Sequence, residues 1–491
     1  MAEQLVLAID QGTSNTKALL VAPDGSVRLS RSRAMEIDYP RPGWAEQSAS
    51  AIWEAVAALI AELAAAAGTA DIVALAISNQ RETIVLWDAD TGRPLGPAVL
   101  WQCRRSADRC GELRAAGHEA EVVARSGLGI DPLFPAAKIA WLLDSVPDAR
   151  ARAERGELRC GTIDAWLLWS LTGGEVHATD HSNASRTQLF NLDTLEWDAE
   201  LARLFDVPLS LLPTVVPSDS RFGVVAPGLT GLREGTPIHA MIGDSHAALF
   251  AHKAAGAHTK VTIGTGSSVM TATDRRIHSS HGLSSTIAWS SGGAVQYALE
   301  GNILVSGAAA SFATTLLGLP DEEALGALAA GVEDSGGVTF VPALAGLGAP
   351  HWCSDARGAI TGLSLGTRPA HIARATLEAI ALQIGDVIAA LDADLGDFLP
   401  ALSVDGGAAR NALLMQLLAD LANRDIIRPT IMEASALGAA RLAYEALGIA
   451  EAPESPVQSE RFAPAMAAGQ RERVVRRWRD AVARTMRDAA S

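Results

Sequence analysis

Two short turns, roughly half the chain apart, look like the same structure built twice. Residues 10–17 read DQGTSNTK and residues 264–268 read GTGSS. Glycine lets a turn bend tightly and lets a ligand approach the backbone, while Thr and Ser hydroxyls add donors beside exposed amide groups. If both turns face one cleft, they can hold the triphosphate of a nucleotide from opposite sides, and Asp10 can reach an associated Mg²⁺. β-branched runs that predict strands flank both turns, at residues 5–9, 18–21, 260–263 and 269–273.

Turns of this composition have a simpler interpretation, because Gly-Thr-rich segments between strands often only reverse the chain. The repetition favours phosphate binding. Two matching strand–turn–strand units in an α/β chain indicate duplicated domains that face each other across a crevice.

A second carboxylate of interest follows a predicted strand. Residues 238–242 are typical of a strand, Gly243 ends it, and Asp244 begins a helix that runs to about residue 256. Aspartate is favoured at the start of a helix, where it accepts a backbone N–H, and this role alone would explain the residue. Ligands of α/β proteins also gather where strands end, and a carboxylate there can accept the proton of an attacking hydroxyl group. Both roles are open to Asp244.

A predicted hairpin brings an arginine, a carboxylate and an indole together. The strand at residues 83–87 is followed by a turn and by a returning strand at residues 98–101. Because the return is antiparallel, Trp101 arrives beside Arg81 and Glu82. Such a cluster suits a small polyhydroxy ligand, since Arg81 donates, Glu82 accepts and Trp101 offers an apolar wall. The alternative is a surface ion pair beside a packed tryptophan.

A strand, a glycine loop and a helix recur near the C-terminus. Residues 402–405 predict the strand, Gly406 and Gly407 the loop, and the helix starts at Asn411. Backbone amides at a helix start attract anions or the polar edge of a nucleotide, and paired glycines let the ligand approach.

Composition restricts the possible partners and the compartment. The chain has 491 residues, which predicts two or three domains, and its 48% hydrophobic and 20% charged residues exclude a disordered protein. A net charge of −16 argues against nucleic acid or an anionic membrane as partner. Residues 51–68 form the longest apolar stretch, but Glu54 and Glu62 interrupt it, so we expect an amphipathic helix. The start lacks a signal peptide and the four cysteines form no Cys-x-x-Cys pair, which predicts a cytoplasmic protein with reduced thiols.

Together these segments resemble the FGGY family of carbohydrate kinases, within the actin and hexokinase ATPase superfamily, and among its members most closely the glycerol kinases. The resemblance implies an α/β fold of two ribonuclease-H-like domains whose inter-domain cleft closes around substrate and MgATP. It places the substrate and phosphate side in residues 1–247 and the nucleotide side in residues 248–491. The matching segments are residues 79–82, 101–105, 179–180, 183–187, 297–301, 346–350 with Trp352, and 357–360.

The resemblance also implies a role for each residue singled out above. Asp244 matches the general base that accepts the proton of the substrate hydroxyl, and Asp10 matches the aspartate that helps to place Mg²⁺. Phosphoryl transfer leaves little covalent work to the protein, so positioning and charge neutralisation would carry the catalysis. The remaining matches are Thr13, Ser14, Lys17, Thr265 and Gly266 for the phosphates, Gly407 and Asn411 for adenosine, and Arg81, Glu82 and Trp101 for the substrate.

Three departures from the glycerol kinase pattern bear on the substrate. Leu133 stands where that group has tyrosine, Ser245 where it has glutamine, and Lys17 where it usually has arginine. Losing two substrate hydrogen bonds of roughly 0.5 to 1.5 kcal/mol each would weaken glycerol binding by roughly 5-fold to 150-fold. The retained Arg81, Glu82 and Trp101 still favour glycerol, with a four-carbon polyol or a short ketose such as erythritol or xylulose as the alternative.

A non-catalytic, actin-like nucleotide-binding protein is the remote alternative, and it would have little use for Asp244. The resemblance further suggests a homodimer or homotetramer.

Overall fold

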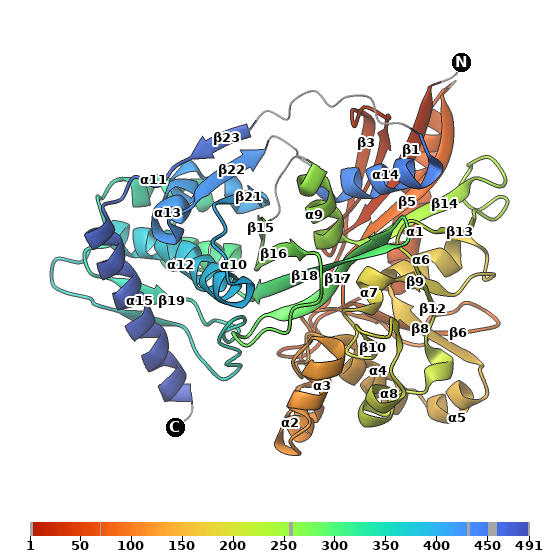
Figure 1. Cartoon of the computed structure of the whole chain (residues 1–491), viewed down its shortest axis with the longest axis horizontal. Helices are drawn as coiled ribbons and strands as arrows, with labels where there is room; N and C mark the ends of the chain where they lie inside the picture. Colours follow the sequence, from red (N-terminus) through yellow and green to blue (C-terminus); the bar gives the residue numbers. More distant parts are fainter. Residues whose placement is uncertain (1–2, 69, 255–258, 430–432, 450–458, 490–491) are drawn as a thin grey trace.

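Two mixed β-sheets organise the computed structural model, which describes residues 3–68, 70–254, 259–429, 433–449 and 459–489 (Figure 1). The first sheet has six strands in the order β13 (Arg221–Val224), β14 (Pro237–Gly243), β5 (Asp71–Asn79), β1 (Gln4–Gln11), β2 (Asn15–Val21) and β3 (Val27–Ala34). The second has seven, in the order β17 (Ser284–Ser291), β18 (Ala294–Ile303), β16 (Ser267–Thr273), β15 (Thr259–Ile263), β21 (Ala401–Asp405), β22 (Asp425–Pro429) and β23 (Ser459–Phe462).

Smaller sheets and the helices surround these two. A four-stranded sheet has the order β4 (Glu46–Gln47), β7 (Ala98–Val99), β6 (Ile84–Asp88) and β8 (Leu158–Thr162), and three pairs join β9 (Ala178–Asp180) to β12 (Thr214–Val216), β10 (Phe190–Asn191) to β11 (Glu196–Trp197), and β19 (Thr339–Val341) to β20 (Ala359–Thr361). The helices are α1 (Ala49–Ala66), α2 (Ala107–Ala115), α3 (Glu119–Ser126), α4 (Pro135–Ser145), α5 (Ala149–Glu154), α6 (Ile163–Leu171), α7 (His181–Ala184), α8 (Ala199–Phe205), α9 (Asp244–Ala254), α10 (Gly307–Leu316), α11 (Glu322–Ala330), α12 (Pro369–Leu395), α13 (Ala412–Ala422), α14 (Ala434–Leu447) and α15 (Ala468–Ala489), with short 3₁₀ turns η1 (Leu209–Leu211) and η2 (Gly407–Arg410).

The first sheet places four polar residues at one edge. β1 and β2 form an antiparallel hairpin in which Asp10 lies opposite Lys17. β1, β5 and β14 are parallel, with Asp10 opposite Ser78 and Ser78 opposite Ile242. The carboxyl ends of parallel strands meet at the same edge, so Asp10 and Asp244, which follows β14, come to that edge together. The predicted strands around the first turn and before Asp244 are confirmed.

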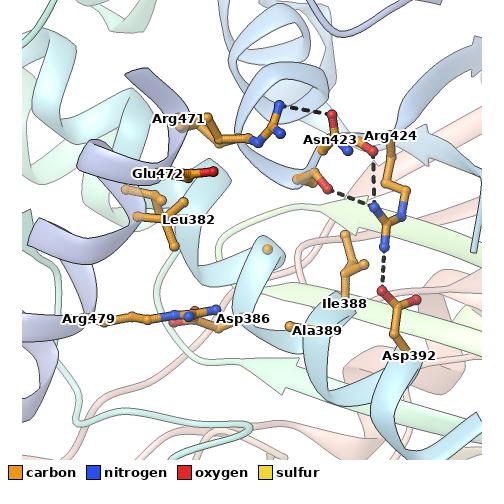
Figure 2. Close-up of a pocket in the computed structure, with 14 residues that line it drawn as sticks. Leu382, Asp386, Ile388, Ala389, Asp392, Asn423, Arg424, Arg471, Glu472 and Arg479 are labelled. Atoms are coloured by element: carbon orange, nitrogen blue, oxygen red, sulfur yellow. Dashed lines mark hydrogen bonds and ion pairs between the residues drawn. The ribbon is translucent and has the colours of Figure 1, made fainter. Parts of the chain in front are cut away.

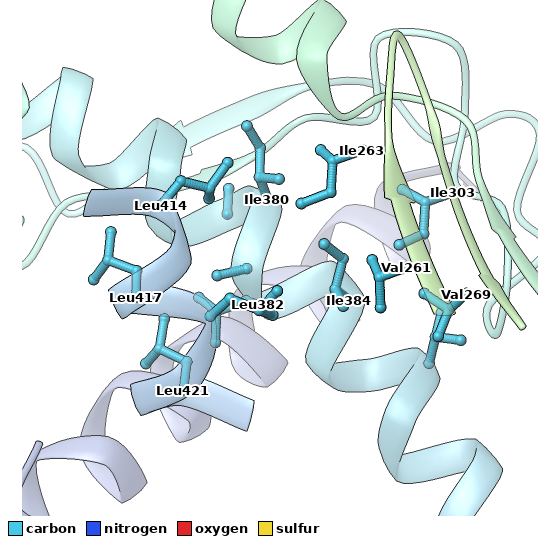
Figure 3. Close-up of a cluster of buried hydrophobic side chains, with 14 of the residues drawn as sticks. Val261, Ile263, Val269, Ile303, Ile380, Leu382, Ile384, Leu414, Leu417 and Leu421 are labelled. Carbon is cyan, nitrogen blue, oxygen red and sulfur yellow. The ribbon is translucent and has the colours of Figure 1, made fainter. Parts of the chain in front are cut away.

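The second sheet repeats the hairpin. β15 pairs antiparallel with β16 around residues 264–266 and parallel with β21, which confirms the strands predicted there. Helices α12 and α13 cover one face of this sheet, and Figure 3 shows Val261 and Ile263 of β15 beside Ile380 and Ile384 of α12. All four side chains are completely buried. This apolar core holds the second turn on a rigid support.

The chain returns to the first sheet near its C-terminal end. α14 packs against α9 and against β1, β5 and β14 (Figure 1). The Tyr444 hydroxyl accepts the Val6 N–H at 3.1 Å and donates to the Val21 carbonyl at 2.7 Å. A Cβ at Gly438 would lie 1.9 Å from the Ala247 carbonyl oxygen, so only glycine allows this approach of α14 to α9.

Helix α9 joins the two halves. It contacts β5 and β14 of the first sheet and β15, β16 and β17 of the second. The division between residues 247 and 248 falls inside this helix, and it stays a prediction.

Among the described residues, α1 is the one helix long and apolar enough to cross a membrane. Its apolar stripe at Ile52, Val56, Leu59 and Leu63 is completely buried in the core beneath the first sheet. α1 is therefore the predicted amphipathic helix, packed as part of a protein core.

Candidate active site

Asp10 and Asp244 form the centre of the site. The Ser78 hydroxyl donates to Asp10 Oδ1 at 3.0 Å from the neighbouring strand. Burial raises the pKa of Asp10 to about 7, and the negative charge of Asp244 adds to the rise while the Ser78 hydrogen bond opposes it. Two carboxylates that share one sheet edge in this way attract a cation.

Asp244 is a partly exposed carboxylate at the start of α9. It is the first residue of α9, its Oδ1 accepts the Ser245 N–H at 2.5 Å, and 34% of its side chain is exposed. Burial by the surrounding segments raises its pKa, and the guanidinium of Arg81, whose Nε donates to Oδ1 at 3.3 Å, opposes the rise. The Asp244 carboxylate accepts a hydrogen bond at the start of the helix and still remains accessible. Its structural role therefore does not exclude a chemical one.

Arg81 and Glu82 belong to a buried network of charges. Arg81 donates from both terminal nitrogens to Glu300, at 3.0 and 2.8 Å. Arg186 lies 2.9 Å from the same carboxylate and donates from Nε to Glu82 at 2.6 Å. Arg81 and Glu82 are only 6% and 5% exposed, so the alternative of a surface ion pair is wrong. The network connects the first half of the chain to β18 in the second sheet.

Opposite charges keep this network ionised. Burial alone would raise the pKa of Glu300, but Arg186 and Arg81 hold it well below its usual range. Burial alone would lower the pKa of Arg81, but Glu300 and Glu82 raise it. Glu300 also accepts from the Ser268 hydroxyl at 2.7 Å, which brings the strand after the second turn into the same network.

Trp101 lies where the hairpin was predicted to place it. β6 and β7 pair antiparallel, and the Trp101 backbone N–H donates to the Thr83 hydroxyl at 3.2 Å. The indole Nε1 donates to the Thr13 hydroxyl at 3.0 Å, which connects this wall to the first turn. Leu133 packs with Trp101 in one small apolar cluster. Glu82 has a φ of 58°, a left-handed conformation that costs a non-glycine residue energy and is common at functional sites.

Lys17 has a partner that the sequence did not suggest. Its ammonium group lies 2.7 Å from the Glu433 carboxylate, next to the start of α14, and about a third of the Lys17 side chain remains exposed. Ser14, also in the first turn, is exposed.

Thr265 and Gly266 lie in the turn directly after β15, Gly407 begins the turn η2 that contacts β15 and β21, and Asn411 follows η2 at the start of α13. A Cβ at Gly266 would lie 2.4 Å from the Ile303 carbonyl oxygen, so the second turn needs glycine there. The Thr265 carbonyl accepts from the N–H groups at the start of α10. Gly407 is exposed in the loop after β21, and the Asn411 side chain accepts the Leu414 N–H at 3.1 Å as the cap of α13.

Helix α9 connects this second group to the first. Asp244 begins the helix, and the ring of His252 on the same helix lies 2.9 Å from Asp405 and 2.7 Å from the Ser403 hydroxyl, both on β21. The buried ammonium of Lys260 lies between the groups: burial lowers its pKa, and the charges of Asp405 and Asp244 oppose this.

The donor set fits a metal shared with phosphates. Within the described ranges, no group of three or more His, Cys, Asp or Glu side chains could hold an ion alone. Mg²⁺ is commonly held by one or two carboxylates together with substrate phosphates. Asp10 and Asp244 meet that requirement, because their mutual repulsion would be relieved by a cation.

A separate hollow of about 240 Å³ lies between α12, the end of α13 and α15. Figure 2 shows Arg424 of this hollow bonded to Asp392, and Arg471 bonded to Asn423. None of its lining residues is a predicted site residue, so it is distinct from the site around Asp244.

Comparison with protein families identifies the chain. A model described as the N-terminal domain of the FGGY family of carbohydrate kinases matches residues 5–251, and the C-terminal domain of that family matches residues 259–447. The chain belongs to the FGGY family of carbohydrate kinases. As an FGGY kinase it is an ATP-dependent phosphotransferase, and the predicted family is confirmed.

Relatives and solved structures of FGGY kinases agree along the whole chain. A protein named glycerol kinase from Thermus brockianus is 46% identical over 486 residues, and one from Burkholderia multivorans is 45% identical over 491, each covering 98% of both chains. The crystal structure of Plasmodium falciparum glycerol kinase with ADP matches with a TM-score of 0.90 at 31% identity and covers 99% of this chain and 98% of that one. A xylulose kinase from Rhodospirillum rubrum matches with a TM-score of 0.84 at 26% identity, covering 99% and 100%. These matches confirm the predicted α/β fold class.

Four residues of this kinase were missed from the sequence, namely Arg186, Glu300, Lys138 and Glu433. Glu300 and Arg186 lie in the matching segments 297–301 and 183–187, so a signal was present without an assigned role. Lys138 lies in an otherwise apolar stretch, where a single lysine indicates a buried charge with a specific partner. No pattern around Glu433 points to Lys17.

Proposed function

We propose that this kinase transfers the γ-phosphate of MgATP to a terminal hydroxyl group of a small polyol, and that glycerol, giving glycerol 3-phosphate, is its preferred substrate. The observation that carries the proposal is the partly exposed Asp244 carboxylate, held by Arg81 beside Asp10. The full-length relatives named glycerol kinase support glycerol as substrate.

Asp244 acts as the general base. Its carboxylate accepts the proton of the attacking hydroxyl group, the substrate oxygen forms a bond to the γ-phosphorus, and the bond from that phosphorus to the β–γ bridging oxygen breaks to release ADP. The partial exposure of Asp244 leaves room for the hydroxyl group, and its raised pKa makes the carboxylate a stronger proton acceptor.

The two turns and the glycine loop bind the nucleotide. Thr13, Ser14 and Lys17 contact the phosphates from one side, and the second turn contacts them from the other through Thr265 and Gly266. Gly407 and Asn411 lie against adenosine. When bound, Mg²⁺ held by Asp10 would neutralise charge on the phosphates. On nucleotide binding the Lys17 ammonium group either leaves the Glu433 carboxylate for a phosphate or contacts both, because the two anions compete for one ammonium group.

The substrate lies between the charged network and the apolar wall. Arg81 and Glu82 supply the donor and the acceptor for the hydroxyl groups, while Trp101 and Leu133 face the C–H groups. Ser245 is shorter than the glutamine expected in a glycerol kinase, which leaves room for a longer chain. A four-carbon polyol or short ketose is therefore the second candidate.

The test is a panel of substrates. Purified protein with MgATP is incubated with glycerol, erythritol, ribitol and xylulose, and ADP release is followed with a coupled assay. The proposal predicts the highest kcat/KM with glycerol. A stronger response to erythritol or xylulose contradicts the substrate, and no stimulation by any polyol or ketose contradicts the proposed reaction.

Assembly and compartment are part of the proposal. Phe312 of α10 stacks on Phe340 of β19, and Leu363 and Leu365, which follow the paired strand β20, are exposed. Exposed apolar side chains of this kind suit contact with a second copy of the chain, so we expect a homodimer or homotetramer. Light scattering of the wild type and of Leu365→Glu tests this, and a monomeric wild type contradicts it. The four free cysteines support the cytoplasm.

A further inference from the structure

Lys138 of α4 carries a charge inside the protein core. Its side chain has no exposed surface, and its neighbours Ala137, Ile139 and Ala140 are buried apolar residues. A buried ammonium group is costly unless hydrogen bonds replace the lost water. The contacts that justify this cost show what the residue does.

The ammonium group of Lys138 donates to three backbone carbonyls. These belong to Leu133 at 2.7 Å, Trp101 at 3.1 Å and Glu82 at 3.5 Å. An ammonium group has three donors, so all of them are directed at these carbonyls. The acceptors come from three separate segments of the chain, and each belongs to a residue proposed above to contact the substrate.

None of the three acceptors lies in a strand or helix. Glu82 has its left-handed φ of 58° in the segment between β5 and β6, Trp101 lies just beyond β7, and Leu133 lies in the turn before α4. Backbone hydrogen bonds between paired strands therefore do not hold these three carbonyls in place. The Lys138 ammonium group instead supplies one donor group shared by all three.

We propose that Lys138 is the positioning residue that holds the substrate wall together, so that the Glu82 carboxylate, the Trp101 indole and the Leu133 side chain keep one fixed geometry around the polyol. The inference rests on the proposed function for the identity of the wall. Lys138 itself has no exposed surface with which to contact substrate. Burial lowers the pKa of Lys138 to about 8, so the ammonium form, which alone supplies three donors, predominates at pH 7.

The first measurement does not depend on activity. Lys138→Met is compared with wild type by hydrogen–deuterium exchange of peptides that cover the three segments. The amides of Thr83, Trp101 and Leu133 each donate a hydrogen bond inside these segments. We expect the exchange of these amides to accelerate by about 10-fold or more, because without the shared donor the three segments can unfold locally at a lower free energy. Exchange in the second sheet should be unchanged.

The matched control is Arg109→Met. Arg109 of α2 also donates from a cationic side chain to a backbone carbonyl, that of Phe205 at 2.8 Å, and it pairs with Asp206, so its bonds run to residues outside the three segments. This variant should leave the exchange of the three segments unchanged. If Lys138→Met does not fold, Lys138→Arg is measured in its place. The arginine head group keeps the positive charge but is larger, so it displaces the donors from the three carbonyls. The same faster exchange in the three segments is then expected.

The second measurement separates positioning from general destabilisation. With Lys138→Met, or its substitute, we expect the KM for glycerol to rise by roughly 10-fold or more, since small misplacements of binding groups are costly. The KM for ATP should rise by clearly less, because Thr13 bonds to the wall through the Trp101 indole but the other proposed nucleotide contacts lie on separate segments. Unchanged exchange in the three segments, or equal rises of both KM values, overturns the proposal. A wild type that phosphorylates no polyol refutes the proposed function instead, and the exchange result still decides the role of Lys138.

Discussion

Glu300→Gln is the variant that most directly perturbs the connection between the two halves of the site. The side chain keeps its shape but loses the negative charge that lies between Arg81 and Arg186. Both guanidinium groups then remain buried, with Arg81 only 6% exposed and Arg186 not exposed at all. Glu82 and Asp244 are the carboxylates left to compensate them.

The expected magnitude follows from this burial. Removing one partner of a buried ion pair costs about 3–5 kcal/mol, because the remaining charge stays in a poorly solvated environment. Glu300 bonds to both terminal nitrogens of Arg81, so the guanidinium that should bind substrate also loses its orientation. We therefore expect the free energy of unfolding to fall by about 3–5 kcal/mol and the KM for glycerol to rise.

The assay pairs urea unfolding, followed by circular dichroism, with steady-state kinetics. Glu378→Gln is the control, since Glu378 is a buried carboxylate paired with Arg374 at 3.1 Å on α12, and its interacting side chains Arg374, Ser335 and Arg477 are not predicted site residues. The control should lose stability while the KM for glycerol stays the same. A Glu300→Gln protein with less than about 1 kcal/mol lost, or with an unchanged KM for glycerol, would refute the reasoning.

Three further predictions concern the nucleotide and the substrate wall. At pH 6 the Asp10 carboxyl, with its pKa of about 7, is mostly protonated, so MgADP binding should release close to one proton. Calorimetry in buffers of different ionisation enthalpy measures this release. It should appear with wild type and not with Asp10→Asn. Lys17→Met should raise the KM for ATP by roughly 10-fold, whereas Glu433→Gln should lower this KM or leave it unchanged. An equal rise of the KM for ATP in both variants would mean that the pair acts only as a structural contact. Leu133→Tyr should lower the KM for glycerol by roughly 2-fold to 10-fold through one added hydrogen bond, and a higher KM would show that the wall has no room for the ring.

The elements around the site could be predicted because each has a local signal. β-branched runs on both sides of a glycine turn gave the two hairpins, and Gly243 separated the strand from the helix that Asp244 begins. The antiparallel return of residues 98–101 placed Trp101 beside Thr83, the residue after Glu82. These patterns depend on residues a few positions apart, which is the range over which side-chain alternation and turn chemistry act.

The buried charges could not be predicted, because their partners are distant in the sequence. Glu300 and Arg81 are 219 residues apart, and charged side chains are normally expected at the surface. Glu433 meets Lys17 across 416 residues through the return of α14 to the first sheet, a packing that no local pattern contains.

The most direct measurement is the glycerol-dependent turnover of Asp244→Asn compared with wild type, together with MgATP binding by both. The amide keeps the shape of the side chain and removes the proton acceptor. We predict that turnover falls by roughly 10² or more while the affinity for MgATP is nearly unchanged. Full turnover by Asp244→Asn would contradict a general base at this position and leave Asp244 with a structural role at the start of α9.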